Sequence, residues 1–187
     1  MNKEDNIKEK FRQALISTVK VISDQYRVET ELKKNLSSKN YNFFDLDNLN
    51  SKQDYISLRA ETDSEALKRK FSNKKIYQKN LPKNSSCRLL YDISEKIRYE
   101  LLGKKMLCGV SKNLSENYKH KITIKRKDQL KSKEDVNVSE AFELYMLKNF
   151  FNIKLNNFSK FKNLVGYSCL PLSNIAFIGF IDVEQET

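Results

Sequence analysis

Glycine and proline, the residues that most often interrupt helices, are scarce in this sequence. Only 4 glycines and 2 prolines occur among 187 residues, against usual shares of roughly 7% and 5%. An architecture of many short strands needs such residues at its turns. Their scarcity argues against a β-sandwich or β-barrel and favours long helices.

A cysteine framework is also missing. The three cysteines, Cys87, Cys108 and Cys169, are odd in number and widely spaced, and no Cys-x-x-Cys pair occurs. This pattern argues against a disulfide scaffold or a zinc site, and it predicts buried free thiols in a reducing compartment.

No segment has the pattern of a secretory signal or a membrane span. Residues 2–10 are almost wholly polar, and the most apolar stretch, residues 164–183, is interrupted by Pro171, Ser173 and Asn174. We therefore expect a cytoplasmic protein with no membrane partner.

Patterns typical of catalysis are equally scarce. Gly103-Lys104-Lys105 lacks the remainder of a phosphate-binding Gly-x-x-x-x-Gly-Lys-Ser/Thr loop. The single histidine, His120, lies among lysines, whose charges disfavour its protonation and repel divalent metals. Cys108 has lysines nearby but no histidine close in sequence, which favours a small core residue over a nucleophile. The sequence predicts no catalytic site, metal site or cofactor in this chain.

A net charge of +11 and a pI near 9.4 are the clearest compositional features present. Such charge suits nucleic acid, an anionic membrane surface or an acidic protein. Lys, Asn, Ile, Phe and Tyr are all abundant, however, as codon bias would produce. A solvated basic surface is the simpler interpretation.

The first helix has the clearest pattern. Apolar residues recur at intervals of four, four, four and three within residues 3–23: Ile7, Phe11, Leu15, Val19 and Ile22. This spacing predicts one apolar face of an amphipathic helix.

Two short strands are predicted next. Residues 26–32 alternate Val28, Thr30 and Leu32 with charged residues, and Tyr55, Ile56 and Leu58 supply the second strand. The intervening residues 33–54 are rich in Asn, Ser, Lys and Asp, and they predict a long loop.

A second helix is predicted to begin at Thr62 or Asp63, whose side chains can cap it. Its Ala66, Leu67 and Phe71 are expected to face inward.

The longest regular stretch is predicted from a cap at Ser85 or Ser86 to about Lys119. Gly103 and Gly109 interrupt it at a cost of about 1 kcal/mol each against Ala. They mark either a break between two helices or the close approach of a neighbouring backbone. Its expected inward face is Cys87, Leu90, Ile93, Ile97, Leu101, Met106 or Leu107, Val110, Leu114 and Tyr118.

Residues 119–136 are the most basic segment, and we predict a loop there. Its cations form the candidate partner surface: Lys119, Lys121, Lys125, Arg126, Lys127, Lys131 and Lys133. A solvated loop is the simpler interpretation, and docking of an acidic protein or an acidic linker is the functional one. Nucleic acid fits less well, because no aromatic side chains are interleaved to stack on bases. A last helix is predicted from a cap at Asn137 or Ser139.

Two blocks of sequence carry a family resemblance. Residues 59–67 read Arg-Ala-Glu-Thr-Asp-Ser-Glu-Ala-Leu, and residues 95–103 read Glu-Lys-Ile-Arg-Tyr-Glu-Leu-Leu-Gly, followed by a Met, a Gly-Val and an Asn-Leu. They resemble Arg-Gly-x-Ala-Asp-x-x-Ala-Leu and Glu-x-x-Arg-x-Glu-x-x-Gly in the N-terminal region of the CobT subunit of aerobic, ATP-dependent cobaltochelatase. The motif residues are Arg59, Asp63, Glu95, Arg98, Glu100, Gly103, Gly109 and Asn113.

The chain also departs from that family. Ala60 replaces a glycine, and Ser72-Asn73 stands where members often have His-Asp. The Asp-x-Ser-x-Ser of the family's von Willebrand A-type domain does not occur. We expect either the N-terminal piece of a longer protein, with an acidic linker beginning at residues 184–187, or a reduced relative.

The resemblance implies a non-catalytic part in cobalt insertion into the corrin ring of hydrogenobyrinic acid a,c-diamide, a step of cobalamin biosynthesis. In that complex an AAA+ ATPase subunit and the CobT subunit act together on a large catalytic subunit. This chain would supply protein-protein docking surface. A basic helical nucleic-acid-binding module and a stand-alone enzyme are the alternatives.

The charged residues of the second block can be structural or functional. Glu95 and Arg98 are three apart on a helix and can pair, while Glu100 points toward Lys104. If buried, Arg98 could instead bridge to a distant carboxylate such as Asp63. Two carboxylates without a third acid or a histidine are a weak metal signal, which favours a structural network. The fold class predicted overall is mainly α, a single helical domain over residues 1–187 with a small β element.

Overall fold

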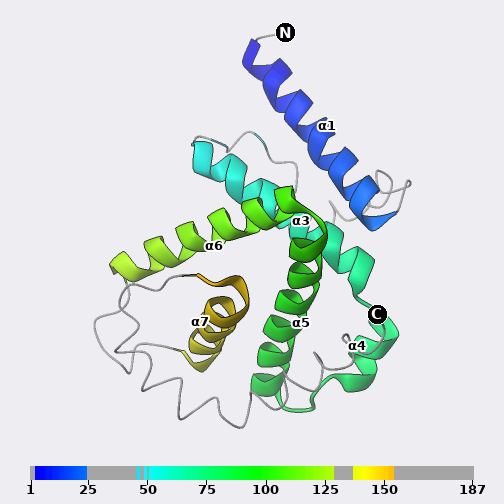
Figure 1. The fold of residues 1–187 in the computed structure, drawn as a ribbon, viewed down its shortest axis with the longest axis vertical. Helices are drawn as coiled ribbons and strands as arrows, with labels where there is room; N and C mark the ends of the chain where they lie inside the picture. Colours follow the sequence, from blue (N-terminus) through cyan, green and yellow to red (C-terminus); the bar gives the residue numbers. More distant parts are fainter. Residues whose placement is uncertain (1–2, 25–45, 47–48, 50, 129–136, 154–187) are drawn as a thin grey trace. The chain divides into compact units, whose positions relative to one another are not determined.

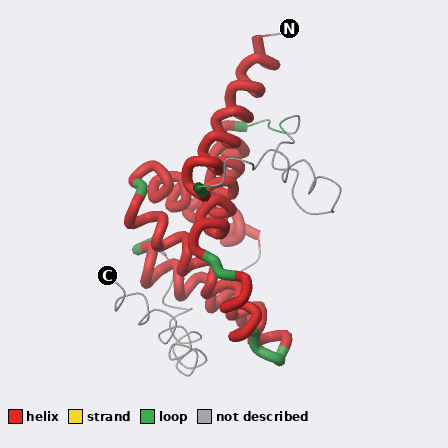
Figure 2. The backbone as a smooth tube through the Cα atoms, turned by 90° about the vertical axis from the view of Figure 1, so that its right-hand side faces the viewer, coloured by secondary structure: helices red, strands yellow, loops and turns green. Residues whose placement is uncertain are grey.

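All the regular structure that can be described in this chain is helical (Figure 1). The structure, a computed structural model, describes residues 3–24, 46, 49, 51–128 and 137–153. The helices are α1 (Lys3–Ser23), α3 (Lys52–Phe71), α4 (Lys74–Asn80), α5 (Ser85–Met106), α6 (Cys108–Asp128) and α7 (Val138–Phe151). The mainly α fold class is confirmed. Figure 2 shows no strand among these residues, and the strand predicted at residues 26–32 lies outside them.

The helices belong to two compact units. The first draws its described residues from 1–72 and 102–117, and the second draws its own from 73–101 and 118–187. The chain therefore passes between the units three times: between α3 and α4, inside α5 and inside α6. The prediction of a single domain stays a prediction.

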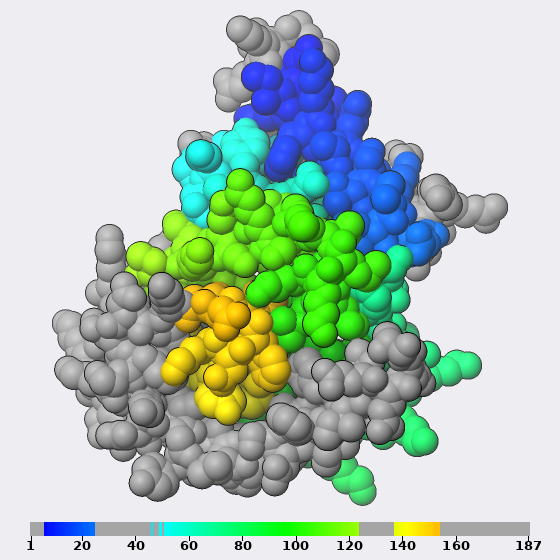
Figure 3. All heavy atoms as spheres, in the orientation of Figure 1, coloured from blue at the N-terminus to red at the C-terminus, as the bar shows by residue number. Residues whose placement is uncertain are grey.

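In the first unit, α1 packs along α3. Leu15, Val19 and Ile22 are buried as their spacing predicts, and the ring of Phe11 meets that of Tyr55 edge-on at 5.1 Å. Figure 3 shows α1 against the beginning of α3. Ile7 was expected on the same face but is exposed, so the buried face is shorter than predicted.

The beginning of α3 differs from the prediction. A capping box starts the helix: the Ser51 hydroxyl accepts from the Asp54 amide at 3.2 Å, and the Asp54 carboxylate accepts from the Ser51 amide at 2.7 Å. This reciprocal pair satisfies two backbone donors. The predicted strand at residues 55–58 is therefore wrong, and so is the loop after residue 51. Thr62 and Asp63 are not caps, because they lie buried in the middle of the helix.

Asparagines begin three of the later helices. Asn73 caps α4 and Asn137 caps α7, the latter as predicted. The Asn84 side chain accepts from the amides of Ser86 and Cys87, so the cap of α5 is neither Ser85 nor Ser86. An asparagine side chain can satisfy these free amides as well as serine can.

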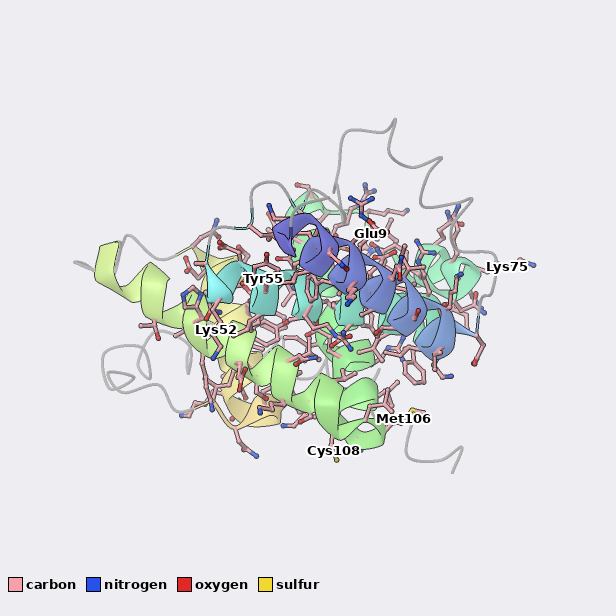
Figure 4. The ribbon with its side chains drawn as sticks, turned by 90° about the horizontal axis from the view of Figure 1, so that it is seen from above. Glu9, Lys52, Tyr55, Lys75, Met106 and Cys108 are labelled. Atoms are coloured by element: carbon pink, nitrogen blue, oxygen red, sulfur yellow. The ribbon has the colours of Figure 1, made fainter. Side chains whose placement is uncertain are left out.

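Two further predictions are wrong. Neither Met106 nor Leu107, at the turn between α5 and α6, faces inward, and the described cysteines are not buried. The helices are separated at Leu107, which is exposed together with Met106, and Figure 4 labels Met106 beside Cys108 at this turn. Cys87 and Cys108 are exposed free cysteines, so the prediction of buried thiols is wrong for both. Cys169 lies outside the described residues.

Helix α6 continues through residues 119–128, where a loop was predicted. Tyr118 and Ile122 are buried on this helix, and the burial of a continuous apolar face favours helix over loop. In α7, Ala141, Phe142 and Met146 are buried. No described helix has the length and apolar character needed to cross a membrane.

Candidate functional site: two buried polar clusters

Asp63 is the centre of the first buried cluster, which we call the Asp63 cluster (Arg59, Asp63 and Asn113). Its side chain is 0% exposed on α3. The Asn113 side-chain amide, on α6, donates to Asp63 Oδ2 at 2.7 Å. Arg59 Nε lies 3.4 Å from Oδ1, one helical turn earlier. Three motif residues, two of them fifty positions apart, therefore meet inside the first unit.

Burial dominates the electrostatics of this cluster. Removal from solvent raises the pKa of Asp63 above its ordinary value, while the hydrogen bond from Asn113 and the charge of Arg59 lower it by less. Asp63 Oδ1 and Arg59 Nε make no hydrogen bond of good geometry. The carboxylate is thus committed to joining α3 and α6, and it is closed to a substrate.

Gly103 permits a close contact in the same unit. A Cβ at this position would lie 2.9 Å from Leu67 Cγ and nearer still to both Leu67 methyl carbons. Leu67 is itself buried on α3. The end of α5 can approach Leu67 only because residue 103 has no side chain. The glycine therefore admits a side chain of a neighbouring helix, whereas the prediction was the close approach of a neighbouring backbone.

Gly109 has no comparable role. A Cβ at this position would meet nothing within 4 Å. The other predicted role, the break between helices, falls at Leu107, between the two glycines.

Glu100 is the centre of the second cluster, which we call the Glu100 cluster (Lys96, Glu100, Tyr118 and Phe151). Glu100 is 1% exposed, and the Tyr118 hydroxyl donates to its Oε2 at 2.5 Å. The Tyr118 ring meets Phe151 edge-on at 5.4 Å, and Lys96 Nζ lies 5.6 Å from the ring centre. α5, α6 and α7 thus converge on one buried hydroxyl and carboxylate within the second unit.

Tyr118 is held in its neutral form. Burial raises the pKa of Tyr118 well above the ordinary value, and the charge and hydrogen bond of Glu100 raise it further. Sequence reasoning placed Tyr118 on an apolar face and missed its hydroxyl as the partner of Glu100. No local pattern joins two residues that are 18 positions apart on different helices.

Arg98 pairs with Glu95 as their spacing predicts. Its Nε and Nη2 each donate to a Glu95 oxygen at 2.7 Å, and both side chains are half-buried. The hydrogen bonds raise the pKa of Arg98. This planar, two-point contact is one that Lys cannot reproduce.

The candidate partner surface lies partly on α6. Lys119 is exposed and Lys121 is half-exposed on this helix. Residues 125–127 fall within its bounds, but nothing is described of their side chains, and Lys131 and Lys133 lie outside the described residues. The role of this surface stays a prediction.

A second basic segment was overlooked in the sequence. Residues 66–91 contain eight basic residues and no Asp or Glu. Counting acids as well as bases along the chain would have found it. The basic residues are Lys68, Arg69, Lys70, Lys74, Lys75, Lys79, Lys83 and Arg88.

Metal ligands do not gather in the part of the chain that is described: no group there of three or more His, Cys, Asp or Glu residues could hold an ion. His120, the only histidine, is half-exposed on α6. The buried carboxylates are each engaged by neighbouring side chains. The arrangement as described is suited to holding helices together.

Comparison with protein-family models gives one informative result. The model described as cobalamin biosynthesis protein CobT matches residues 5–151, which include both buried clusters. Searches of the curated proteins and of the solved structures find no match.

Proposed function

The chain belongs to the CobT family of cobalamin biosynthesis proteins, and we propose that it acts as a non-catalytic subunit or domain of ATP-dependent cobaltochelatase. On this proposal it assembles with the AAA+ ATPase subunit and supports insertion of cobalt, the substrate metal, by the large catalytic subunit. ATP hydrolysis and tetrapyrrole binding then belong to its partners.

The burial of Asp63, Glu100 and Gly103, three of the eight motif residues, is the observation that carries this proposal. Asp63 and Asn113 bond to each other, and Gly103 accommodates Leu67. A catalytic carboxylate must reach its substrate, whereas Asp63 is enclosed. The buried residues among those that carry the family resemblance hold helices together, which favours the surface as the part that acts on other molecules.

The chemistry of that surface suits an acidic protein partner. The chain has a net charge of +11, and Lys119 and Lys121 follow Tyr118 on α6, where Lys119 is exposed and Lys121 is half-exposed. Complementary charge accelerates encounter and fixes orientation more than it adds affinity. A surface of this kind suits a subunit that joins and leaves an ATP-driven complex.

Reconstitution tests the proposal directly. Cobalt insertion into hydrogenobyrinic acid a,c-diamide is measured with the ATPase and large subunits, ATP and Co²⁺, in the presence and absence of this chain. We expect insertion to require the chain, and the chain alone to insert no cobalt and hydrolyse no ATP. Insertion that proceeds equally without it, or failure of the chain to associate with the ATPase subunit in sedimentation, would contradict the proposal.

Nucleic acid binding is the alternative to be separated. The test is a gel-shift titration with duplex DNA in low and moderate salt. Contacts to phosphates release counterions, so the affinity of a protein for DNA falls steeply as the salt concentration rises. A specific complex that weakens tenfold or more between these conditions would favour the alternative. Association with the ATPase subunit that does not change with salt would count against an acidic partner for residues 119–136.

A further inference from the structure

Helix α4 and the beginning of α5 form an exposed basic surface in the second unit. Between residues 73 and 91 the chain has five basic residues and no acidic one, and α4 has no buried residue. We call the following set the α4–α5 surface: Lys74, Lys75, Ile76, Lys79, Lys83 and Leu89. All six side chains are exposed.

Side-chain contacts hold α4 against the beginning of α5. The Tyr77 hydroxyl of α4 donates to Asp92 of α5, and the Tyr77 and Tyr91 rings lie 5.3 Å apart. Arg88 Nε donates to the Pro82 carbonyl at 2.7 Å, which secures the connection between the helices. The bond to Asp92 raises the pKa of Tyr77 to about 12. These contacts fix α4 against α5 and engage the Asp92 carboxylate.

The lysines of the surface have no neutralising partner in the described residues. No ion pair joins Lys74, Lys75, Lys79 or Lys83 to a described carboxylate, and Lys75 projects away from the ribbon in Figure 4. The positive charges of Lys74, Lys75 and Lys79 lie on one short helix, α4, and repel each other. An anionic partner would relieve this repulsion.

Two branched apolar side chains stand among these cations. Ile76 is 58% exposed and Leu89 is 48% exposed. A phosphate backbone gives alkyl groups no apolar surface to cover them, and neither can stack on a base as an aromatic ring does. Two residues are also too little apolar area for stable insertion into a bilayer. A protein segment that carries both carboxylates and apolar side chains can satisfy both features.

We propose that the α4–α5 surface docks an acidic protein segment in which apolar side chains are interspersed among Asp and Glu. Carboxylates of the segment pair with the lysines, and its apolar side chains cover Ile76 and Leu89. This inference goes beyond the proposed function, because it concerns a different surface from residues 119–136. Its test measures peptide binding and does not depend on cobalt insertion.

Fluorescence anisotropy on the full chain tests the inference with two labelled peptides. The first is a 20-residue Asp/Glu peptide with Leu at every third or fourth position, and the second carries Ser in place of each Leu. We expect the leucine peptide to bind about tenfold more tightly, since covering two half-exposed alkyl side chains has an effect of roughly that size. Ile76→Ser combined with Leu89→Ser should abolish the difference and leave binding of the serine peptide unchanged.

Charge reversal gives the second arm. Lys75→Glu with Lys79→Glu should weaken both peptides at least tenfold. The matched control is Lys10→Glu with Lys112→Glu, two exposed lysines of the first unit, which changes the net charge equally and should weaken them less than threefold. Thermal unfolding checks that each variant folds, and Lys75→Gln with Lys79→Gln serves as the milder pair.

Three results would overturn the inference. Equal affinity for the two peptides would show that Ile76 and Leu89 contribute nothing to binding. Equal weakening of peptide binding by the control pair would show that only the net charge of the chain matters. Tighter binding of a 20-nucleotide single strand, or of phosphatidylcholine vesicles containing phosphatidylserine, through Lys75 and Lys79 would assign the surface to another class of partner.

Discussion

Asp63 and Glu100 are the two most deeply buried carboxylates among the described residues, and each depends on a side chain from a distant part of the chain. Asp63 accepts from the Asn113 amide and Glu100 from the Tyr118 hydroxyl. A buried acceptor that loses its donor keeps the full cost of leaving water. Single substitutions at the donors should therefore have large effects.

Replacing Tyr118 with Phe tests the Glu100 cluster. The ring contact with Phe151 is kept while one hydrogen bond to Glu100 is lost, so we expect the free energy of unfolding to fall by about 1–3 kcal/mol. Urea denaturation measures it. Tyr55→Phe is the control, because the Tyr55 ring packs on Phe11 and its hydroxyl bonds to no described residue; its change should stay within about 0.5 kcal/mol. Similar losses in both variants would contradict this role for Tyr118.

Asp63→Asn tests the direction of the pKa shift. Because burial raises the folded-state pKa of Asp63 above 3.8, its folded form binds the proton more tightly than its unfolded form. Its contribution to stability is fully present below pH 3.8 and is lost as the pH rises through the raised pKa. The unfolding free energy of the wild type relative to Asp63→Asn should therefore increase on acidification through that range. A relative decrease would mean that the ion pair with Arg59 outweighs burial.

At the scale of the helix, Gly103 decides how closely α5 approaches α3. Leu67 is buried, so its methyl groups cannot move aside cheaply when a Cβ is added. Alanine is the better helix former by about 1 kcal/mol, and the steric cost opposes that gain.

We expect Gly103→Ala to destabilise the protein by a net 1–3 kcal/mol or so, since overpacking outweighs helix propensity in a filled core. Gly109→Ala is the matched control and should be neutral or stabilise by up to about 1 kcal/mol, because its new methyl group meets nothing. Thermal unfolding compares the two variants. Gly103→Ala should cost less in a Leu67→Ala background than in the wild type, because the leucine methyl groups that its Cβ would meet are gone. A stabilising Gly103→Ala would refute the close contact.

Helices α1 and α7 could be predicted because their signals are local. α1 has a regular apolar stripe and α7 an asparagine cap, and both signals lie within a few turns of chain. The beginning of α3 could not be read in this way, because Tyr55, Ile56 and Leu58 alternate over a stretch too short to separate strand from helix. The capping box of Ser51 and Asp54 was the signal that would have decided it.

The sequence could predict which residues belong to the candidate site, but it could not predict which of them contact each other. The family blocks named Asp63, Glu100, Gly103 and Asn113, but spacing along a chain reports only neighbours within about one turn. Asp63 and Asn113 are separated by fifty residues, and their contact depends on how α3 packs with α6. Thr62 and Asp63 also have side chains that commonly cap helices. For that reason the start of α3 was predicted at these residues, which are buried in the middle of the helix.

For the molecule as a whole, the proposed function separates stability from activity. Tyr118→Phe and Gly103→Ala, assayed well below their melting temperatures, should support cobalt insertion within about twofold of wild type in the reconstituted complex. Lys119→Glu, at an exposed lysine of α6, should instead leave the melting temperature nearly unchanged and weaken association with the ATPase subunit severalfold at low salt. A loss of insertion in the folded core variants at saturating subunit concentrations would point to a catalytic role for the clusters.

The passage of α5 and α6 through both compact units has a consequence for dissecting the gene. A fragment that stops at residue 101 would contain Asp63 and Leu67 but not Asn113 or Gly103, so the first unit would lose the contacts that complete its core. No single cut yields either unit intact, and a split into halves should give two poorly folded products. A design that joins residues 1–72 to residues 102–117 with a flexible linker, and ends there, would isolate the first unit.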